Sequence, residues 1–419
     1  MKTVSGIDFG TTNSAVSYII EEKVKLVEFE NNNITIPTAL FFTAGKNKKL
    51  YGQEAVDAFL GGEDGRFMKS IKSVLGSPLM DGSTRIGKYT VDFGSIIRFF
   101  ITHLKSILDT NTGAPVDSVV MGRPVRFNEK DEKLDSRAQS MLGDIVRNSG
   151  YQYVDFQYEP VAAAFSHERQ ITGEKLAMVV DVGGGTSDFT VIKIGDKLKD
   201  KIDRGDDILA NSGVKVGGDT LDKNLSFNGF MPLFGLWTTM GKDQLPIPGH
   251  LYSDLSDWSG INFFYESRKM REIRDICREA NEKEKAGRLM ELINGKRVHE
   301  LLRIVEQAKI DLSTHDTTES ILTLLKDRPM VKTKLSEFDE YSEKTYEKIH
   351  NSLKECMIQA GKKGSDINLV ILTGGSTDVA YIKKMIGATF PQAELSDKFK
   401  MTSVAEGLAY DAKRRFLGG

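Results

Sequence analysis

The chain has little of what marks secreted, membrane-spanning or zinc-binding proteins. It holds two cysteines, Cys277 and Cys356, and six histidines, and no Cys-x-x-Cys pair occurs. A disulfide framework and a structural zinc site both need more such residues, so we expect neither. No long apolar run follows Met1, and no stretch of about eighteen apolar residues occurs. We therefore expect no signal peptide, no membrane-spanning helix and a cytoplasmic location.

The chain also lacks a strong excess of charge of either sign. Its 57 Lys and Arg residues nearly balance its 59 Asp and Glu residues, which gives a formal net charge of -2. Broad nucleic-acid binding needs a basic surface that displaces counterions, so we expect no nucleic-acid partner. A chain of 419 residues exceeds one ordinary domain and suits two lobes of α/β type.

What the sequence does contain is a short apolar strand that ends at a glycine turn, repeated along the chain. The predicted strands are residues 4–9, 119–121, 177–180 and 369–372, which lead to Gly10, Gly122, Gly183 and Gly374. Runs this apolar indicate strands that are buried on both faces of a sheet.

The first and third repeats share one layout. An Asp, Asp8 or Asp181, comes two residues before the glycine, and a second apolar strand follows, at residues 15–20 or 189–194. These glycines are therefore predicted to lie in β-turns between antiparallel strands. The second and fourth repeats each follow a helical segment, and a repeat this long predicts two similar lobes that face each other.

The repeat predicts where the lobes lie. Lobe I is expected at residues 1–172 and lobe II at 173–399, with peripheral subdomains at about 39–110 and 226–328 and a final helix in 400–419 that returns to lobe I. Helices near 161–164 and 403–409 are rich in small residues, which suits a hinge, although ordinary core packing would explain either helix alone. The Lys-rich segment 46–49 is interpreted as a solvated hairpin tip.

Glycine turns bring backbone N–H groups close to an anion, because no Cβ blocks the approach. The hydroxyls of Thr11, Thr12 and Thr186 can add hydrogen bonds to phosphate oxygens. Two carboxylates beside a polyphosphate need a cation between them, and Mg²⁺ keeps several waters, so Asp8 and Asp181 are predicted to act through bound water. Asp188 could join the same network, or simply cap a turn.

These motifs resemble those of the heat-shock protein 70 (DnaK-type) chaperone family. Residues 6–14 and 181–188 are similar to its two phosphate loops, 159–164 to a connecting helix, and 372–377 to its adenosine motif. No Walker A sequence is present, and no Rossmann glycine motif occurs at these loops. The resemblance covers nearly the whole chain, is weakest at 226–300, and implies an α/β fold of actin-like ATPase type with two duplicated lobes around a nucleotide cleft.

The resemblance also implies roles for single residues. Lys72, in the sequence Ile-Lys-x-x-x-Gly, is implied as the catalytic lysine on a helix, although Lys69 is an alternative on charge alone. Glu159, Asp181 and Thr186 complete the implied catalytic set, and Asp8, Asp181 and Asp188 hold Mg²⁺ through water. The implied cofactors are ATP or ADP with Mg²⁺, and K⁺ is left open.

The remaining implied residues bind the nucleotide. Glu306, Lys309 and Ser313 are expected on one helix face, near the nucleoside, although a surface Glu–Lys pair would explain them equally. The full implied set is Gly10, Thr11, Thr12, Asn13, Gly183, Gly184, Gly185, Gly217, Gly218, Asp219, Glu306, Lys309, Ser313, Gly374, Gly375 and Ser376.

The sequence departs from the family in two places. Ile310 and Asp378 stand where the family has two arginines around adenine, which predicts weaker base recognition. Nothing resembles the start of the linker to the family's peptide-binding domain, so we expect a relative of the short members that lack it.

Three functions follow from this reading. The leading one is a slow Mg²⁺-dependent ATPase of chaperone type whose lobes rotate and signal to a separate protein. The alternatives are a nucleotide-dependent regulator or scaffold without turnover, and a small-molecule kinase, for which no acceptor motif is found. A protein partner or co-chaperone is expected at 226–300, where Trp237, Phe263, Phe264 and Tyr265 form an exposed patch or else a private core.

Overall fold

In a computed structural model, the chain divides into two units, and each is described here by itself. The described residues are 3–45, 48–128, 131–201, 203–258, 267–398 and 400–418. Unit 1 comprises Met1–Gly217, Lys348–Thr377 and Met385–Gly419, and unit 2 comprises Gly218–Glu347 and Asp378–Lys384.

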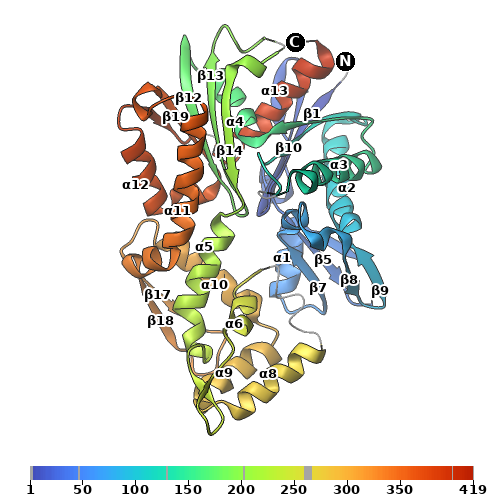
Figure 1. Cartoon of the computed structure of the whole chain (residues 1–419). Helices are drawn as coiled ribbons and strands as arrows, with labels where there is room; N and C mark the ends of the chain where they lie inside the picture. Colours follow the sequence, from blue (N-terminus) through green and yellow to red (C-terminus); the bar gives the residue numbers. More distant parts are fainter. Residues whose placement is uncertain are drawn as a thin grey trace. The chain divides into compact units, whose positions relative to one another are not determined.

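Two sheets of unit 1 repeat the same topology (Figure 1). The strands of the first are β1 (Val4–Phe9), β2 (Asn13–Ile20), β3 (Lys23–Leu26), β4 (Ile36–Pro37), β10 (Ser118–Arg123) and β11 (Tyr153–Tyr158). Those of the second are β12 (Glu174–Val182), β13 (Ser187–Gly195), β14 (Ile208–Val214), β19 (Leu369–Thr373) and β20 (Glu394–Ser396). The orders are β11-β10-β1-β2-β3 and β20-β19-β12-β13-β14, and β4 pairs with β2.

In both sheets an antiparallel hairpin is extended by parallel strands on one side and an antiparallel strand on the other. The hairpins are β1–β2 and β12–β13, the parallel neighbours are β10 and β19, and the antiparallel neighbours are β3 and β14. The predicted duplication is therefore confirmed. It does not coincide with the division into units, because both sheets lie in unit 1.

Helices recur at matching places along the two repeats. α2 (Phe93–Thr112) precedes β10 as α11 (Leu335–Gln359) precedes β19. α3 (Glu132–Asn148) and α12 (Ala380–Thr389) each come between the two parallel strands, and α4 (Glu159–Glu168) and α13 (Ser403–Leu417) follow them. None of the helices in the described ranges is long and apolar enough to cross a lipid bilayer.

α2 shows how the sequence positions the first sheet. The Asp92 side chain caps the helix by accepting a hydrogen bond from the backbone N–H of Ser95 at 2.7 Å. Ile97, Phe100 and Leu104 recur at helical spacing and are fully buried in one core cluster with strand residues of β1 and β10. Burying this apolar stripe fixes α2 on the sheet, at about 25 cal/mol for each Å² removed from water.

The peripheral elements are small and differ between the units. Unit 1 carries β5 (Ala39–Thr43), β6 (Lys49–Tyr51), β7 (Gly65–Lys69), β8 (Ser83–Ile86), β9 (Tyr89–Asp92) and α1 (Gly52–Leu60). Unit 2 carries α5 (Gly218–Leu225), β15 (Thr239–Met240), β16 (Leu245–Pro246), α6 (Gly249–Leu255), α8 (Ser267–Glu279), α9 (Lys283–Asn294), α10 (Val298–Asp311), β17 (Thr317–Ile321) and β18 (Met330–Lys334).

In unit 2, α8 and α9 are separate helices, and between them the backbone N–H of Asn281 donates to Thr239 O at 2.9 Å. The two tryptophans of unit 2 differ in exposure. Trp258 is buried, whereas Trp237 is 63% exposed. The expected roles of Phe263, Phe264 and Tyr265, and of Lys46 and Asn47 in the hairpin tip, lie outside the described residues.

The two small-residue helices α4 and α13 pack directly on each other (Figure 1). An ideal Cβ placed on Gly407 of α13 would lie 1.7 Å from the backbone oxygen of Ala162 in α4. The crossing is therefore close enough to exclude even a methyl group at this position.

We predict that Gly407→Ala destabilises the protein by about 3 kcal/mol or more, since the added methyl overlaps a backbone atom. The measurement is the shift of the urea unfolding midpoint. Gly387→Ala is the matched control: Gly387 also lies in a helix, but its Cβ would meet nothing within 4 Å. The control should be neutral or gain about 0.5–1 kcal/mol. Equal midpoints for the two variants would contradict the described crossing.

Candidate functional site

Two glycine turns meet in unit 1. One joins β1 to β2 after Gly10, and the other joins β12 to β13 at Gly183–Thr186, where the N–H of Gly183 donates to Thr186 O at 3.0 Å. An ideal Cβ on Gly185 would lie 2.8 Å from Thr11 Oγ1. The structure therefore brings together the two turns that were predicted to bind phosphate.

Carboxylates gather beside these turns. Asp8 lies near the end of β1, Asp181 lies near the end of β12, and Asp188 is the direct cross-strand neighbour of Asp181. Glu159 is the first residue of α4. Glu159, Asp181 and Asp188 are buried, and Asp8 is largely buried. We call Asp8, Glu159, Asp181 and Asp188 the carboxylate cluster.

The cluster is joined by the Lys72 ammonium. Lys72 Nζ lies 2.5 Å from Glu159 Oε1, and the two side chains are 7% and 9% exposed. Lys72 was expected on a helix, but it lies on a short 3-10 turn, η2 (Ile71–Val74), between Ser70 at φ 57° and Gly76 at φ 69°. These left-handed residues end the turn on both sides and prevent a longer helix. The alternative, Lys69, is the last residue of β7.

Burial and mutual repulsion raise the proton affinity of the cluster. Burial, followed by the charge of Glu159, raises the pKa of Asp8 and of Asp188 to about 7 each. The same causes, in the same order, hold the pKa of Asp181 well above its usual value. Burial alone would lower the pKa of Lys72, but the charges of Glu159 and Asp8 outweigh it and raise that pKa.

The cluster is chemically suited to a hydrated cation. Asp188 Oδ1 accepts the Val125 N–H at 2.9 Å, while Asp188 Oδ2 is buried and accepts no hydrogen bond from the described part of the chain. Among the described residues, no three His, Cys, Asp or Glu side chains lie close enough to hold a metal ion directly. The buried acceptor of Asp188 that lacks a donor fits a hydrated Mg²⁺, which the sequence predicts beside Asp8, Asp181 and Asp188.

Two further predicted turns adjoin the cluster. An ideal Cβ on Gly374, at φ 78°, would lie 2.8 Å from Asp181 Oδ1, so the turn that continues through Gly375 and Ser376 begins against Asp181. An ideal Cβ on Gly217 would lie 2.6 Å from Gly183 O. The residues predicted from distant parts of the chain therefore converge in unit 1.

The remaining predicted residues lie in unit 2. Gly218 and Asp219 begin α5, and Glu306 and Lys309 lie on α10. Ser313 was expected on the same helix, but α10 ends at Asp311, two residues before it. The Ser313 hydroxyl donates to Lys309 O at 3.3 Å.

Lys309 has a partner that the sequence analysis missed. Lys309 Nζ lies 2.8 Å from Asp222 Oδ1, and the two side chains are 10% and 3% exposed. Burial raises the pKa of Asp222 to about 6, although the Lys309 charge opposes this shift. Lys309 is therefore part of a buried ion pair and not of an exposed surface pair. Asp222 lies three residues after Asp219 on α5, but no pattern in the sequence indicates which helix α5 contacts.

The two residues that replace arginines are both accessible. Ile310 on α10 is 52% exposed. Asp378 pairs with Lys383 at 2.8 Å, with about half of each side chain exposed. The ammonium of Lys383 therefore places a cation next to a position where the resembled family has an arginine.

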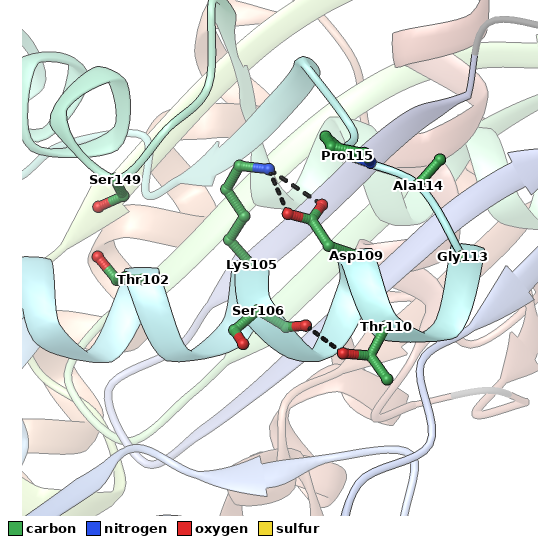
Figure 2. A pocket seen from close by; sticks show the side chains of 9 residues that line it. All are labelled: Thr102, Lys105, Ser106, Asp109, Thr110, Gly113, Ala114, Pro115 and Ser149. Atoms are coloured by element: carbon green, nitrogen blue, oxygen red, sulfur yellow. Dashed lines mark hydrogen bonds and ion pairs between the residues drawn. The ribbon is translucent and has the colours of Figure 1, made fainter.

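A separate cavity of about 580 Å³ lies along α2 in unit 1 (Figure 2). It is lined by Thr102, Lys105, Ser106, Asp109, Thr110, Gly113, Ala114, Pro115 and Ser149. Lys105 Nζ already donates to Asp109 at 2.8 Å and to Val116 O at 3.2 Å, so its charge is satisfied within the protein. None of the predicted site residues lines this cavity, and we assign it no function.

Two protein family models match different segments of the chain. The MreB/Mbl protein family model matches residues 2–227, which carry the carboxylate cluster, Lys72 and both phosphate turns. The Hsp70 protein family model matches residues 272–413, which include Lys309 and the Gly374–Ser376 turn. Both matches support a nucleotide-binding ATPase of actin-like fold. The two matches support the actin-like and Hsp70 ATPase superfamily that the sequence motifs indicate, but they do not single out the DnaK-type chaperones.

We predict that Asp8→Asn stabilises the metal-free protein near pH 8. The raised pKa of Asp8 means that the folded protein holds this proton more tightly than the unfolded chain, so stability falls as pH rises from about 4 to about 7. Asparagine removes this penalty, which is about 1.4 kcal/mol for each unit of pKa. Melting temperatures at pH 5 and pH 8 test this.

Asp81→Asn is the contrasting control. The hydrogen bond from Arg137 lowers the pKa of Asp81, so its stabilisation is present above the ordinary pKa and is lost only in acid. This variant should melt no higher than wild type at pH 8. An Asp8→Asn protein that melts below wild type at pH 8 would contradict the described electrostatics.

Proposed function

The chain belongs to the MreB/Mbl family of actin-like ATPases, and we propose that it binds ATP with Mg²⁺ at the carboxylate cluster and hydrolyses it slowly. The observation that carries this proposal is the burial of Glu159, Asp181 and Asp188, together with the largely buried Asp8, beside the Lys72 ammonium. Uncompensated buried charge is costly, so such a cluster favours a site that a cation completes.

Different groups of the chain are proposed to act in separate parts of the hydrolysis. Backbone N–H groups of the turns after Gly10 and Gly183 would hold the phosphates, and the Thr186 hydroxyl would add a hydrogen bond near the transferring group. Lys72, held by Glu159, would place the attacking water and stabilise charge on the phosphoryl group. Asp181, whose pKa burial holds well above its usual value, would complete the catalytic set beside Lys72 and Thr186.

Asp8, Asp181 and Asp188 would hold the metal through water. Mg²⁺, when bound with the nucleotide, would supply positive charge to the phosphate oxygens. The buried Oδ2 of Asp188 supports this assignment, because an acceptor in that place gains a hydrogen-bond donor from a metal-bound water. The carboxylates could also bind K⁺, but no feature of the cluster favours K⁺ over Mg²⁺.

In unit 2, the residues proposed to contact the nucleotide are Gly218, Asp219, Glu306, Lys309 and Ser313. In unit 1, Gly217, Gly374, Gly375 and Ser376 are proposed to contact it. The ion pair of Lys309 with Asp222 supports a fixed position for this ammonium. Ile310 can offer an apolar surface to the base. We expect weaker selectivity for adenine than in the resembled family, because Ile310 and Asp378 replace two arginines there. A cation over an aromatic ring contributes roughly 0.5–2 kcal/mol to binding.

A regulated partner is part of the proposal. ATP turnover would be coupled to rotation of the lobes, and this chaperone-like protein would signal its nucleotide state to a separate protein partner or co-chaperone. Trp237 is a candidate contact for the partner, since it is exposed and has a positive φ of 64°, which is strained for a bulky residue. The alternative is a regulator that binds nucleotide without turnover.

We predict that Lys72→Met reduces ATP hydrolysis at least about a hundredfold, since it removes a charge that acts on the transferring group. The assay measures phosphate release with Mg²⁺ and no added acceptor. Lys69→Met is the matched control, because Lys69 lies three residues earlier, on β7. Its turnover should stay near that of the wild type. Circular dichroism of each variant checks folding.

Each other outcome has a meaning. Tight ATP binding by the wild type without phosphate release would favour the non-hydrolysing regulator. Phosphate transfer that needs an added metabolite would favour a small-molecule kinase. Equal turnover in Lys72→Met and wild type would overturn the catalytic role of Lys72.

A further inference from the structure

The turn that carries Lys72 leaves two of its carbonyl groups for an outside donor. The carbonyls of Ser70, Lys72 and Val74 accept hydrogen bonds from the N–H groups of Ser73, Leu75 and Ser77. The carbonyls that alternate with them, at Ser73 and Leu75, both accept from Lys215 Nζ, at 3.1 and 3.4 Å. Buried or half-buried backbone carbonyls need such partners, so Lys215 completes the hydrogen bonding of the turn.

Lys215 comes from a distant part of unit 1. It directly follows Val214, the last residue of β14, and β14 is the edge strand of the second sheet. The carbonyls that it binds flank Lys72 on the segment between β7 and α2. One side chain thus connects the edge of the second sheet to the turn that holds the proposed catalytic lysine.

The backbone beside Lys215 also touches the second glycine turn. Val216 O accepts a hydrogen bond from Ser187 Oγ at 2.8 Å. An ideal Cβ on Gly217 would lie 2.7 Å from Gly184 O, so the two backbones are in close contact. Residues 214–217 therefore touch the proposed phosphate turn directly and reach the Lys72 turn through Lys215.

We propose that Lys215 is a positioning residue that fixes the Lys72 ammonium relative to the second phosphate turn. This inference rests on the proposed ATPase function, and no separate role of Lys215 in binding nucleotide is invoked. An ammonium suits the task because it has three donors and no acceptor, so it can hold two carbonyls together. Loss of these bonds would let the turn move, and a displacement of about 1 Å can reduce a rate about a hundredfold.

The test uses the whole chain and three substitutions. Lys215→Met removes the ammonium and keeps the stem, whereas Lys215→Arg keeps a cationic donor. Lys193→Met is the control, because Lys193 is an exposed lysine on β13 of the same sheet. Two quantities are measured: hydrogen exchange of the backbone amides of residues 70–77 without nucleotide, and kcat and KM for Mg-ATP.

For Lys215→Met we expect exchange at residues 70–77 to become at least about tenfold faster, since local opening follows the loss of hydrogen bonds. We expect kcat to fall roughly tenfold to a hundredfold, with KM changed less than about twofold, because positioning acts on the transition state. Lys215→Arg should recover most of both values, and Lys193→Met should resemble the wild type.

The two hypotheses fail separately. Unchanged exchange in Lys215→Met, a loss of kcat in Lys193→Met of the same size, or a rise of KM alone would overturn the role of Lys215. A wild type without phosphate release would overturn the proposed ATPase function, and the exchange of residues 70–77 would still decide whether Lys215 holds the turn.

Discussion

The mutual repulsion of buried carboxylates is the constraint on which the account of this protein depends. Asp8, Asp181 and Asp188 have raised pKa values, and burial is the largest cause for each. Lys72 joins them through Glu159, but one ammonium does not balance four carboxylates. The carboxylates therefore hold protons more tightly than usual, and a hydrated cation would reduce the same repulsion.

The duplicated fold is what creates this constraint. Each repeat ends a buried hairpin strand with an Asp just before a glycine turn, and both hairpins lie in unit 1. The tight crossing of α4 and α13, at Gly407, fixes the helix whose first residue is Glu159. Concentrating charge in the buried carboxylate cluster lowers the stability of the folded protein, which is typical of functional sites.

Local patterns made much of this predictable from the sequence. The hairpins, their aspartates and the glycine turns are encoded in short segments, so the repeat alone indicated Asp8 and Asp181. The Hsp70 resemblance added Lys72 and Glu159, and the structure joins them at 2.5 Å. The bonds of Asp222 to Lys309, Val125 to Asp188 and Lys215 to the Lys72 turn were not predictable, because each joins segments far apart in the chain.

Proton release on nucleotide binding tests the central claim most directly. Preformed Mg-ADP is titrated into the wild type by calorimetry at pH 7 and pH 9, in two buffers of different ionisation enthalpy. At pH 7 the cluster is partly protonated, because the pKa values of Asp8 and Asp188 are about 7, so binding of the cation should release about one proton. At pH 9 the release should be much smaller. Tight binding without proton release at pH 7 would contradict the account.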